Sequence, residues 1–314
     1  MNRKDLKTSE AKFLDLSVVG RFAPSPTGDL HLGSLVAATA SYLNVKQQQG
    51  KWFVRIDDVD TPRVVLGCDT QILKTLEAFG FEWDFVVYQS QRTEHYHQAL
   101  SQLHSNDAVY VCHCTRKQLK DRTPFFPLYD RHCRDLQLSC CFEQHCALRL
   151  KTPLASYAQP CWRWQDLIQG DQQTHWQRDV DDFIVKRSDG FVAYHLACAV
   201  DDADFGITEV IRGADLLSST APQQLIQALL GKSSPVYGHH PLIFDRNSGI
   251  KLSKASAAPA LDVAIAGHLL VNVLTFLGQN PPMALAQEPI NVIWQWAIAH
   301  WQLDSLKQNE RSKT

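Results

Sequence analysis

The chain has 314 residues, of which 45% are hydrophobic, enough for one large α/β domain with an insertion and a short tail. Its 31 basic and 33 acidic side chains give a formal net charge of -2. This balance gives no overall electrostatic reason to expect a polyanionic partner, so any binding of RNA requires a local basic surface.

Neither the N-terminal nor the C-terminal segment has the pattern of a secretory signal or of a membrane-spanning helix. Residues 1–17 mix basic and acidic side chains without the continuous apolar core of a secretory signal, which predicts a flexible extension. The apolar stretch Ile290–Leu303 is interrupted by Asn291, Gln295 and His300, which favours an amphipathic helix over a membrane span. We therefore expect a cytoplasmic protein that does not bind membranes.

Residues 18–110 alternate short β-branched or aromatic runs with helical segments, the pattern of a parallel-sheet α/β domain. The predicted elements are strands at Val18–Phe22 and Trp52–Ile56, a helix at about Leu32–Gln48, and a helix that Thr61-Pro62 caps and that runs to Phe79. The domain is thus expected to begin with a βαβ unit.

Residues 111–178 lose this periodicity, and their clustered Cys, His and Pro predict an insertion held by something other than an apolar core. The α/β pattern resumes over 179–256, and 257–314 are expected to form a helical C-terminal region. The later predictions are strands at Phe183–Val185, Phe191–Val200, Ile207–Arg212 and Leu242–Phe244, and a helix at Ser219–Leu230. A Rossmann-like parallel sheet split by a connecting insertion accounts for this order.

A first nucleotide signal spans Arg21 to Ser34, where the first predicted strand ends and the first helix begins. A helix N-terminus offers unpaired amide groups and positive potential to phosphate, and Gly33 lets an adenine ring approach the backbone. His31 can donate to phosphate oxygens. A capped strand-to-helix turn without a ligand is the alternative interpretation, because His-x-Gly alone is a weak motif.

A second signal is Lys251-Leu-Ser-Lys254, in a loop preceded by Asn247-Ser-Gly249. Two lysines there can fold over ATP and neutralise charge on the departing pyrophosphate, which is electrostatic rather than covalent catalysis. An exposed Lys-x-x-Lys is usually only a solvated loop. Its value comes from its partnership with the first motif.

Together the two motifs resemble the signature sequences of class I aminoacyl-tRNA synthetases, with His31-Leu-Gly-Ser34 in place of His-Ile-Gly-His. The run Arg21-Phe-Ala-Pro-Ser-Pro-Thr-Gly28 narrows the resemblance to the glutamyl and glutaminyl branch. Arg55-Ile-Asp-Asp-Val-Asp60 is similar to that branch's Arg-Ile-Glu-Asp-Thr-Asp. The resemblance implies a class I synthetase catalytic domain.

Only about 60 residues follow Lys254, too few for the anticodon-binding region of a full-length glutamyl-tRNA synthetase. The chain therefore most resembles the family of glutamyl-queuosine tRNA(Asp) synthetases, which are truncated paralogues. Four further segments are similar to that family: Val111–Thr115, Tyr129–Cys133, Ala193–Ala197 and Ile211–Asp215.

This resemblance implies that the chain uses ATP, with Mg²⁺, to convert L-glutamate to glutamyl-adenylate without tRNA. The glutamate would then pass to queuosine at the wobble position of tRNA(Asp). We also expect a monomer. Two alternatives stay open: a glutamyl-tRNA synthetase that charges the tRNA 3′ end, and a catalytically silent RNA-binding paralogue.

The family's site residues carry over position by position. Implied glutamate-binding residues are Arg21, Phe22, Ala23, Pro24, Ser25, Asp57, Tyr194 and Arg212. Implied ATP-binding residues are His31, Gly33, Ser34, Lys251, Ser253 and Lys254, of which His31, Lys251 and Lys254 would be catalytic. Two arginines suit an amino acid with two carboxylates, because guanidinium recognises carboxylate with paired hydrogen bonds.

Three of these positions have open alternatives. The residue at 57 would hold the substrate ammonium, and here it is Asp57 where the family has Glu, one methylene longer. Arg212 could instead form a structural ion pair with Asp215 or Asp202. Tyr194, on a predicted strand, could be a packed aromatic.

Five of the nine cysteines lie between residues 112 and 141, and with no secretory signal such clusters more often bind metal than form disulfides. Cys112, Cys114 and Cys133, with Tyr129, could complete a tetrahedral zinc site, and the family resemblance implies a structural zinc there. Alternative fourth ligands are His113, His132, Cys140 and Cys141, and free thiols without metal are the other interpretation. Cys68 and Cys198 are predicted to be buried thiols.

Overall fold

The computed structural model describes residues 17–123, 128–138, 146–154, 161–243 and 259–307. Its strands are β1 Val19–Phe22, β2 Lys51–Ile56, β3 Phe85–Tyr88, β4 Val109–Cys112, β5 Ala147–Leu150, β6 Cys161–Asp166, β7 Gly170–His175, β8 Ile184–Lys186, β9 Glu209–Gly213 and β10 Val236–His240. Its α-helices are α1 Leu32–Lys46, α2 Cys68–Ala78, α3 Thr93–Ser105, α4 Arg116–Arg122, α5 Tyr194–Asp204, α6 Thr220–Leu229, α7 Ala266–Phe276 and α8 Ile290–His300.

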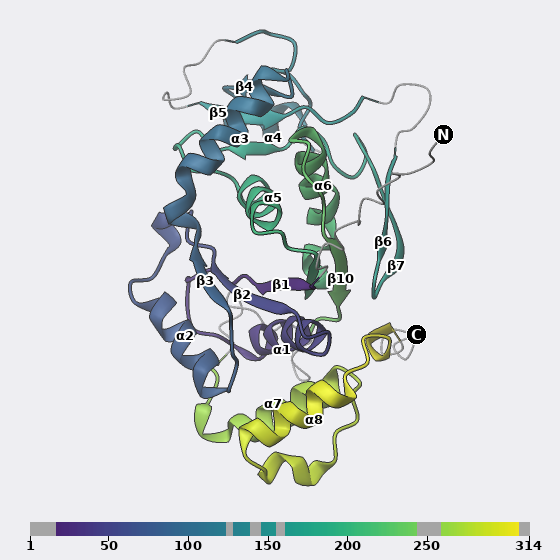
Figure 1. Cartoon of the computed structure of the whole chain (residues 1–314). Coiled ribbons are helices and arrows are strands. Elements are labelled where there is room, and N and C mark those ends of the chain that lie inside the picture. Colours follow the sequence, from purple (N-terminus) through teal and green to yellow (C-terminus); the bar gives the residue numbers. More distant parts are fainter. Residues whose placement is uncertain (1–16, 124–127, 139–145, 155–160, 244–258, 308–314) are drawn as a thin grey trace, which may run out of the picture.

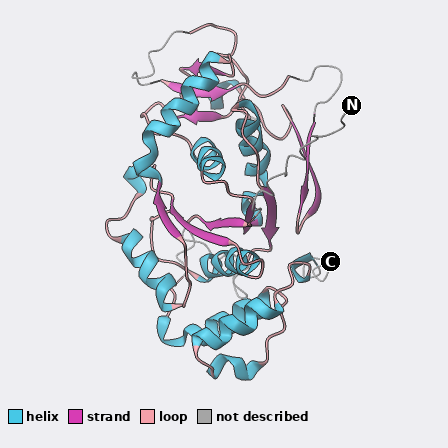
Figure 2. Ribbon diagram, in the orientation of Figure 1, coloured by secondary structure: helices cyan, strands magenta, loops and turns pink. Residues whose placement is uncertain are grey.

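The centre of the molecule is a parallel sheet assembled from two runs of strands (Figures 1 and 2). In one run β1 pairs with β2 and β2 with β3, and in the other β9 pairs with β10 and β10 with β6, all parallel. The runs meet where the Thr208 amide donates to the Val19 carbonyl at 2.9 Å. From β1 the sheet is extended on one side by β2 and β3, and on the other side by β9 and β10. The strand order therefore reverses between β1 and β9, and α/β sheets bind ligands at such switch points.

Helices cover this sheet on both faces (Figure 1). On one face α1 is buried almost throughout and separates the sheet from α7 and α8 (Figure 1). Trp294 in α8 and Trp301 just after it are 5% and 2% exposed. On the other face α5 and α6 share a second apolar cluster with α3 and the β4 strand. A parallel sheet with helices on both faces confirms the predicted fold class.

The segment 111–178 contributes to two sheets. Strands β4, β5 and β8 form a small antiparallel sheet, and the β6-β7 hairpin joins the edge of the central sheet through β10. The tertiary structure therefore joins this segment to the rest of the chain through backbone pairing, which its irregular sequence pattern did not predict.

Three predicted elements were wrong. Phe191–Val200 is not a strand: after one bridge at Val192 the chain enters α5, because a short continuous apolar run fits a buried helix as well as a strand. The strand predicted at 242–244 lies earlier, as β10, which ends before Pro241, a residue without a backbone donor; Phe244 lies outside the described residues. The helix predicted from Thr61 begins only at α2, after a 3-10 turn at Thr61–Arg63 and a left-handed Gly67 with φ 77°.

The two predicted buried thiols were confirmed. Cys68 and Cys198 are buried thiols at 5% and 0% exposure. Within the described ranges, none of the helices combines the length and the hydrophobicity that a membrane crossing requires.

Candidate active site

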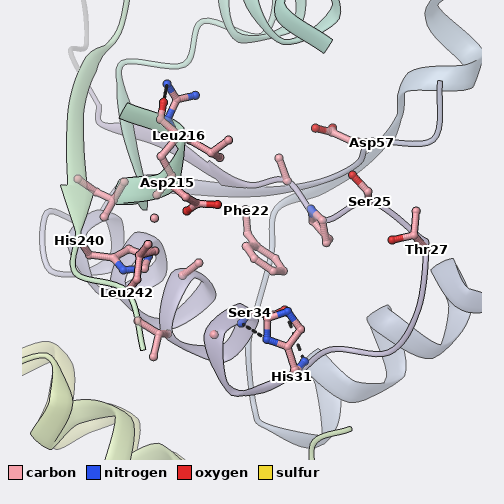
Figure 3. Close-up of a pocket in the computed structure, with 18 of the residues that line it drawn as sticks. Phe22, Ser25, Thr27, His31, Ser34, Asp57, Asp215, Leu216, His240 and Leu242 are labelled. Carbon is pink, nitrogen blue, oxygen red and sulfur yellow. Dashed lines mark hydrogen bonds between the residues drawn. The ribbon is translucent and has the colours of Figure 1, made fainter. Parts of the chain in front are cut away.

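A cavity of about 400 Å³ opens at the switch point, where β1, β9 and β10 end and α1 begins. Such a volume is typical of small-molecule sites. Figure 3 shows Asp57 and Ser25 on one side, Asp215 and His240 on the other, and Phe22 between them. All the predicted glutamate-binding and ATP-binding residues that the structure describes line this cavity. They are Arg21, Phe22, Ala23, Pro24, Ser25, His31, Gly33, Ser34, Asp57, Tyr194 and Arg212. The predicted Lys251, Ser253 and Lys254 lie outside the described residues.

His31 caps the N-terminus of α1 at the cavity wall. Its Nδ1 accepts from the Ser34 amide at 3.4 Å, and the Ser34 hydroxyl oxygen accepts from the His31 amide at 3.5 Å, as the dashed lines of Figure 3 show. Because Nδ1 is the acceptor, a neutral His31 ring carries its proton on Nε2. Ser34, which replaces the second histidine of the common motif, thus has a local role in fixing the helix start and the His31 ring.

A network of paired charges lies beneath the β1 and β2 side of the cavity. Arg21 at the end of β1 donates to both oxygens of Asp202, from Nε at 3.1 Å and Nη2 at 3.2 Å. Arg55 on β2 donates to Asp202 at 2.7 Å and, from Nε, to Asp57 at 2.6 Å. All four side chains are at most 6% exposed. The two guanidinium groups and two carboxylates neutralise one another.

Asp57 is therefore drawn toward Arg55 within this network. Its second oxygen accepts from Arg55 Nη2 at 3.2 Å, and its backbone amide donates to the Pro24 carbonyl at 3.0 Å. Burial raises the pKa of the Asp57 carboxyl, and the Arg55 charge opposes that shift. The shorter Asp side chain lines the cavity at the same time as it pairs with Arg55.

Arg212, on β9 across the cavity, has only neutral partners. Its Nε donates to His239 Nε2 at 2.9 Å, Nη1 to Gln223 at 2.8 Å, and Nη2 to Thr220 at 2.9 Å and to the Leu216 carbonyl at 3.2 Å. It forms no salt bridge with any residue in the described part of the chain, so the alternative pairing with Asp215 or Asp202 was wrong. A guanidinium that is 4% exposed, with no carboxylate of the described residues within 4.0 Å, can still gain from a directly bound anion.

Tyr194 begins α5 and lines the cavity between the two arginine sides. It exposes 40% of its surface, which excludes the alternative of a fully packed aromatic. Its neighbour His195 has a buried Nδ1 without a partner among the described residues. Burial, together with the Arg212 charge, lowers the pKa of His195 to about 4.

Sequence reasoning missed two residues that hold the site, His239 and Asp166, and it named Asp202 only as a possible partner of Arg212 rather than of Arg21 and Arg55. All three are at most 1% exposed. One signal was available: Asp201 and Asp202 are adjacent acids within a run of apolar residues, and buried acids require partners. His239 and Asp166 had no such local signal.

The predicted thiol cluster also forms, away from the cavity. The Sγ atoms of Cys112, Cys114 and Cys133 lie within 4.8 Å of one another. The Tyr129 hydroxyl oxygen is 3.4 Å from Cys112 Sγ and 3.7 Å from Cys114 Sγ. The alternative ligands His113 and His132 are exposed and do not belong to this cluster.

Residues 17–268 match the family described as tRNA synthetases class I (E and Q), catalytic domain. Together with the central parallel sheet and the cavity at its switch point, this match defines the class: a class I tRNA synthetase catalytic domain, an enzyme of the ligase type, as the two motifs predicted. A solved glutamate-tRNA synthetase from Elizabethkingia anophelis superposes with a TM-score of 0.76 and 26% identity. That likeness covers 92% of this chain but 66% of the other, so the chain spans just under two thirds of that synthetase.

Curated relatives match over nearly their whole length. The glutamyl-Q tRNA(Asp) synthetase of Pseudomonas aeruginosa (strain LESB58) is 45% identical over 286 residues, which cover 91% of this chain and 94% of the relative. That of Synechococcus sp. is 46% identical over 299 residues, covering 93% and 97%. The chain belongs to the glutamyl-Q tRNA(Asp) synthetase family.

Proposed function

We propose that this protein activates L-glutamate with ATP to form glutamyl-adenylate, without tRNA, and transfers the glutamate to queuosine at the wobble position of tRNA(Asp). The observation that carries the proposal is the single cavity lined by Arg21, Asp57, Tyr194 and Arg212 together with the His31 cap of α1. The proposal is supported by curated relatives that are 45% and 46% identical and are named glutamyl-Q tRNA(Asp) synthetase.

The cavity chemistry suits glutamate. Arg212 lacks an anion, and Arg21 has Nη1 uncommitted after its two bonds to Asp202, so each can donate to a substrate carboxylate. Asp57, whose two oxygens accept from Arg55, offers its carboxylate to the substrate ammonium. Because all three groups are nearly buried, a substrate that pairs them replaces water at little further cost.

ATP would bind over the N-terminus of α1, with Gly33 beneath the adenine and His31 Nε2–H toward a phosphate oxygen. A glutamate carboxylate oxygen attacks the α-phosphorus, a P–O bond forms to give glutamyl-adenylate, and the bond to pyrophosphate breaks. Lys251 and Lys254 neutralise the charge that develops on the pyrophosphate. Mg²⁺ accompanies the ATP phosphates.

In the second step a queuosine ring hydroxyl attacks the activated glutamyl carbonyl. The ester bond forms, the hydroxyl gives up its proton, and AMP leaves. The side chains that bound glutamate keep the acyl group in place while the leaving group changes.

A direct test follows pyrophosphate exchange with ATP, Mg²⁺ and L-glutamate in the absence of RNA. We expect glutamate-dependent exchange, and then glutamylation of tRNA(Asp) that contains queuosine but not of tRNA(Asp) that lacks it. Charging of tRNA(Glu) independent of queuosine would support the rival 3′-end synthetase. Absence of exchange, together with no ATP or glutamate binding by calorimetry, would support the silent RNA-binding paralogue.

We further propose that Cys112, Cys114, Cys133 and Tyr129 hold a structural zinc ion. Tetrahedral Zn–S bonds of about 2.3 Å place sulfurs roughly 3.8 Å apart, and the Cys114 to Cys133 Sγ distance is 3.4 Å. Three of the four side chains are at most 7% exposed. Arg149 and Arg122 donate to Cys112 and Cys114 Sγ at 3.3 and 3.1 Å, which favours the thiolate form that zinc requires. The ion would join the β4 end to the loop that carries Tyr129.

Metal analysis of the purified protein tests this site independently of activity. We expect one zinc per chain, lost in Cys114→Ser and retained in the control Cys161→Ser, whose thiol is free on β6. Equal zinc content in both variants would contradict the ligand set. A monomeric state and a cytoplasmic location stay predictions, which gel filtration and cell fractionation would test.

A further inference from the structure

A buried chain of three side chains runs behind the cavity, from Asp166 on β6 through His239 on β10 to Arg212 on β9. We propose that Asp166 and His239 are positioning residues that fix the Arg212 guanidinium for a substrate carboxylate. This inference rests on the proposed glutamate site and adds two residues that touch neither substrate nor ATP.

Asp166 is anchored by backbone amides. Its Oδ1 accepts from the amides of Ile168, Gln169 and His239 at 2.9 to 3.0 Å. Its Oδ2 lies 2.5 Å from His239 Nδ1. With Oδ1 fully used by the backbone, the carboxylate has one fixed orientation and presents Oδ2 to the imidazole.

That contact decides the tautomer of His239. A carboxylate can only accept, so Nδ1 carries the proton and Nε2 carries the lone pair. Nε2 then accepts from Arg212 Nε at 2.9 Å, a bond that the other tautomer and the doubly protonated ring would forbid. Burial lowers the pKa of His239, which keeps the ring neutral.

The arrangement leaves Arg212 directed toward the cavity. Of the five N–H donors of a guanidinium, four bind His239, Gln223, Thr220 and the Leu216 carbonyl, and one on Nη1 is uncommitted. A small rotation of the group would lose that donor. A carboxylate in the place of His239 would fix the group as well, but it would neutralise the charge that the substrate needs.

The test substitutes Asp166→Asn. The Asn oxygen can keep the three backbone amides, but its NH₂ then donates to His239 Nδ1 and forces the proton onto Nε2, against Arg212 Nε–H. We expect the KM for glutamate in pyrophosphate exchange to rise tenfold or more, as for a hydrogen bond to a charged group, with the KM for ATP unchanged. The control Tyr237→Phe removes a buried hydroxyl on β10 that has no partner among the described residues, and should change neither constant.

A second pair of variants covers the case in which Asp166→Asn does not fold. His239→Gln can offer its amide oxygen to Arg212, whereas His239→Leu cannot, so the former should retain more glutamate affinity than the latter. Nitrogen-15 shifts of the wild-type histidines should show a His239 ring protonated at Nδ1. Active wild-type enzyme with an unchanged glutamate KM in Asp166→Asn, or in His239→Leu, would overturn the positioning role and leave the proposed function intact. Inactive wild-type enzyme would overturn the proposed function itself.

Discussion

The two sides of the cavity hold their arginines in opposite ways. On the β1 and β2 side, Arg21 forms a two-bond pair with Asp202 and belongs to a network in which every charge has a partner. On the β9 and β10 side, Arg212 is bound only by neutral acceptors, and the nearest acid in its chain of contacts, Asp166, is separated from it by His239. On the β1 and β2 side each charged group has an oppositely charged partner without substrate. On the β9 and β10 side Arg212 has no carboxylate in direct contact among the described residues.

This difference predicts that the two arginines contribute to different properties, Arg21 to the stability of the fold and Arg212 to the binding of substrate. A buried ion pair is strongly destabilised when one partner is removed, because the other charge is then left alone. A buried cation with neutral hydrogen bonds gains most when an anion arrives. The β1 and β2 side should therefore govern stability, and the β9 and β10 side should govern affinity for glutamate.

The largest expected effect is on stability. Asp202→Ala leaves Arg21 and Arg55 without their shared carboxylate, and should lower the free energy of unfolding by roughly 3 to 5 kcal/mol in urea denaturation. The control is Asp304→Ala, since Asp304 is 83% exposed and pairs with Lys307 at the surface, and its loss should change the free energy of unfolding little. Equal losses in the two variants would remove the distinction between the sides.

The pH dependence of stability tests the environment beside Arg212. His195 has a folded pKa of about 4, below its unfolded value of 6.5. As pH falls from 6.5 to 4 the unfolded chain takes the proton first, so the free energy of unfolding should fall by about 2 to 3 kcal/mol through this residue, allowing for its partial exposure. His195→Phe should flatten that part of the curve, and superimposable curves for the two proteins would contradict the assignment.

An effect on binding of similar or smaller size is expected for Arg212→Leu. Removing the cation while filling its space should lower kcat/KM for glutamate by about 10- to 100-fold, the equivalent of roughly 1.5 to 3 kcal/mol. The free energy of unfolding should fall less than in Arg21→Leu, because the hydrogen-bond partners that Arg212 leaves behind are neutral, whereas Arg21 leaves a carboxylate. The matched variant Arg21→Leu leaves the buried Asp202 with Arg55 as its remaining cation and should destabilise the fold. A stable Arg21→Leu beside an unfolded Arg212→Leu would reverse the comparison.

The smallest effect is expected for Asp57→Glu, which restores the side chain usual in the family. The added methylene should carry the carboxylate further toward the substrate ammonium, and we expect the KM for glutamate to fall several-fold, about 1 kcal/mol. Asp58→Glu is the neighbouring control, because Asp58 accepts from the Ser90 amide and hydroxyl at 2.7 Å and does not line the cavity. An unchanged KM in Asp57→Glu would mean that this carboxylate does not contact the ammonium.

The sequence by itself determined the features that depend on residues close together in the chain. The strand, turn and helix from β1 to α1, with their His31 cap, follow from local patterning and hydrogen bonds between His31 and Ser34. The family resemblance of the same segment was enough to predict the class of enzyme and eight cavity-lining residues between Arg21 and Ser34. Cys112 and Cys114 were likewise predicted as partners from their spacing and from the resemblance.

Only the tertiary structure decided what holds those residues in place. Asp202 reaches Arg21 across 181 positions of the sequence, and His239 reaches Asp166 across 73. The apolar run at 191–200 became a helix from Tyr194 onward because residues 196–200 are buried, most of them in the apolar cluster shared with α6, which no local pattern reveals. The partners of a buried charge depend on which strands lie side by side, so the contrast between the paired Arg21 and the unpaired Arg212 had to come from the fold.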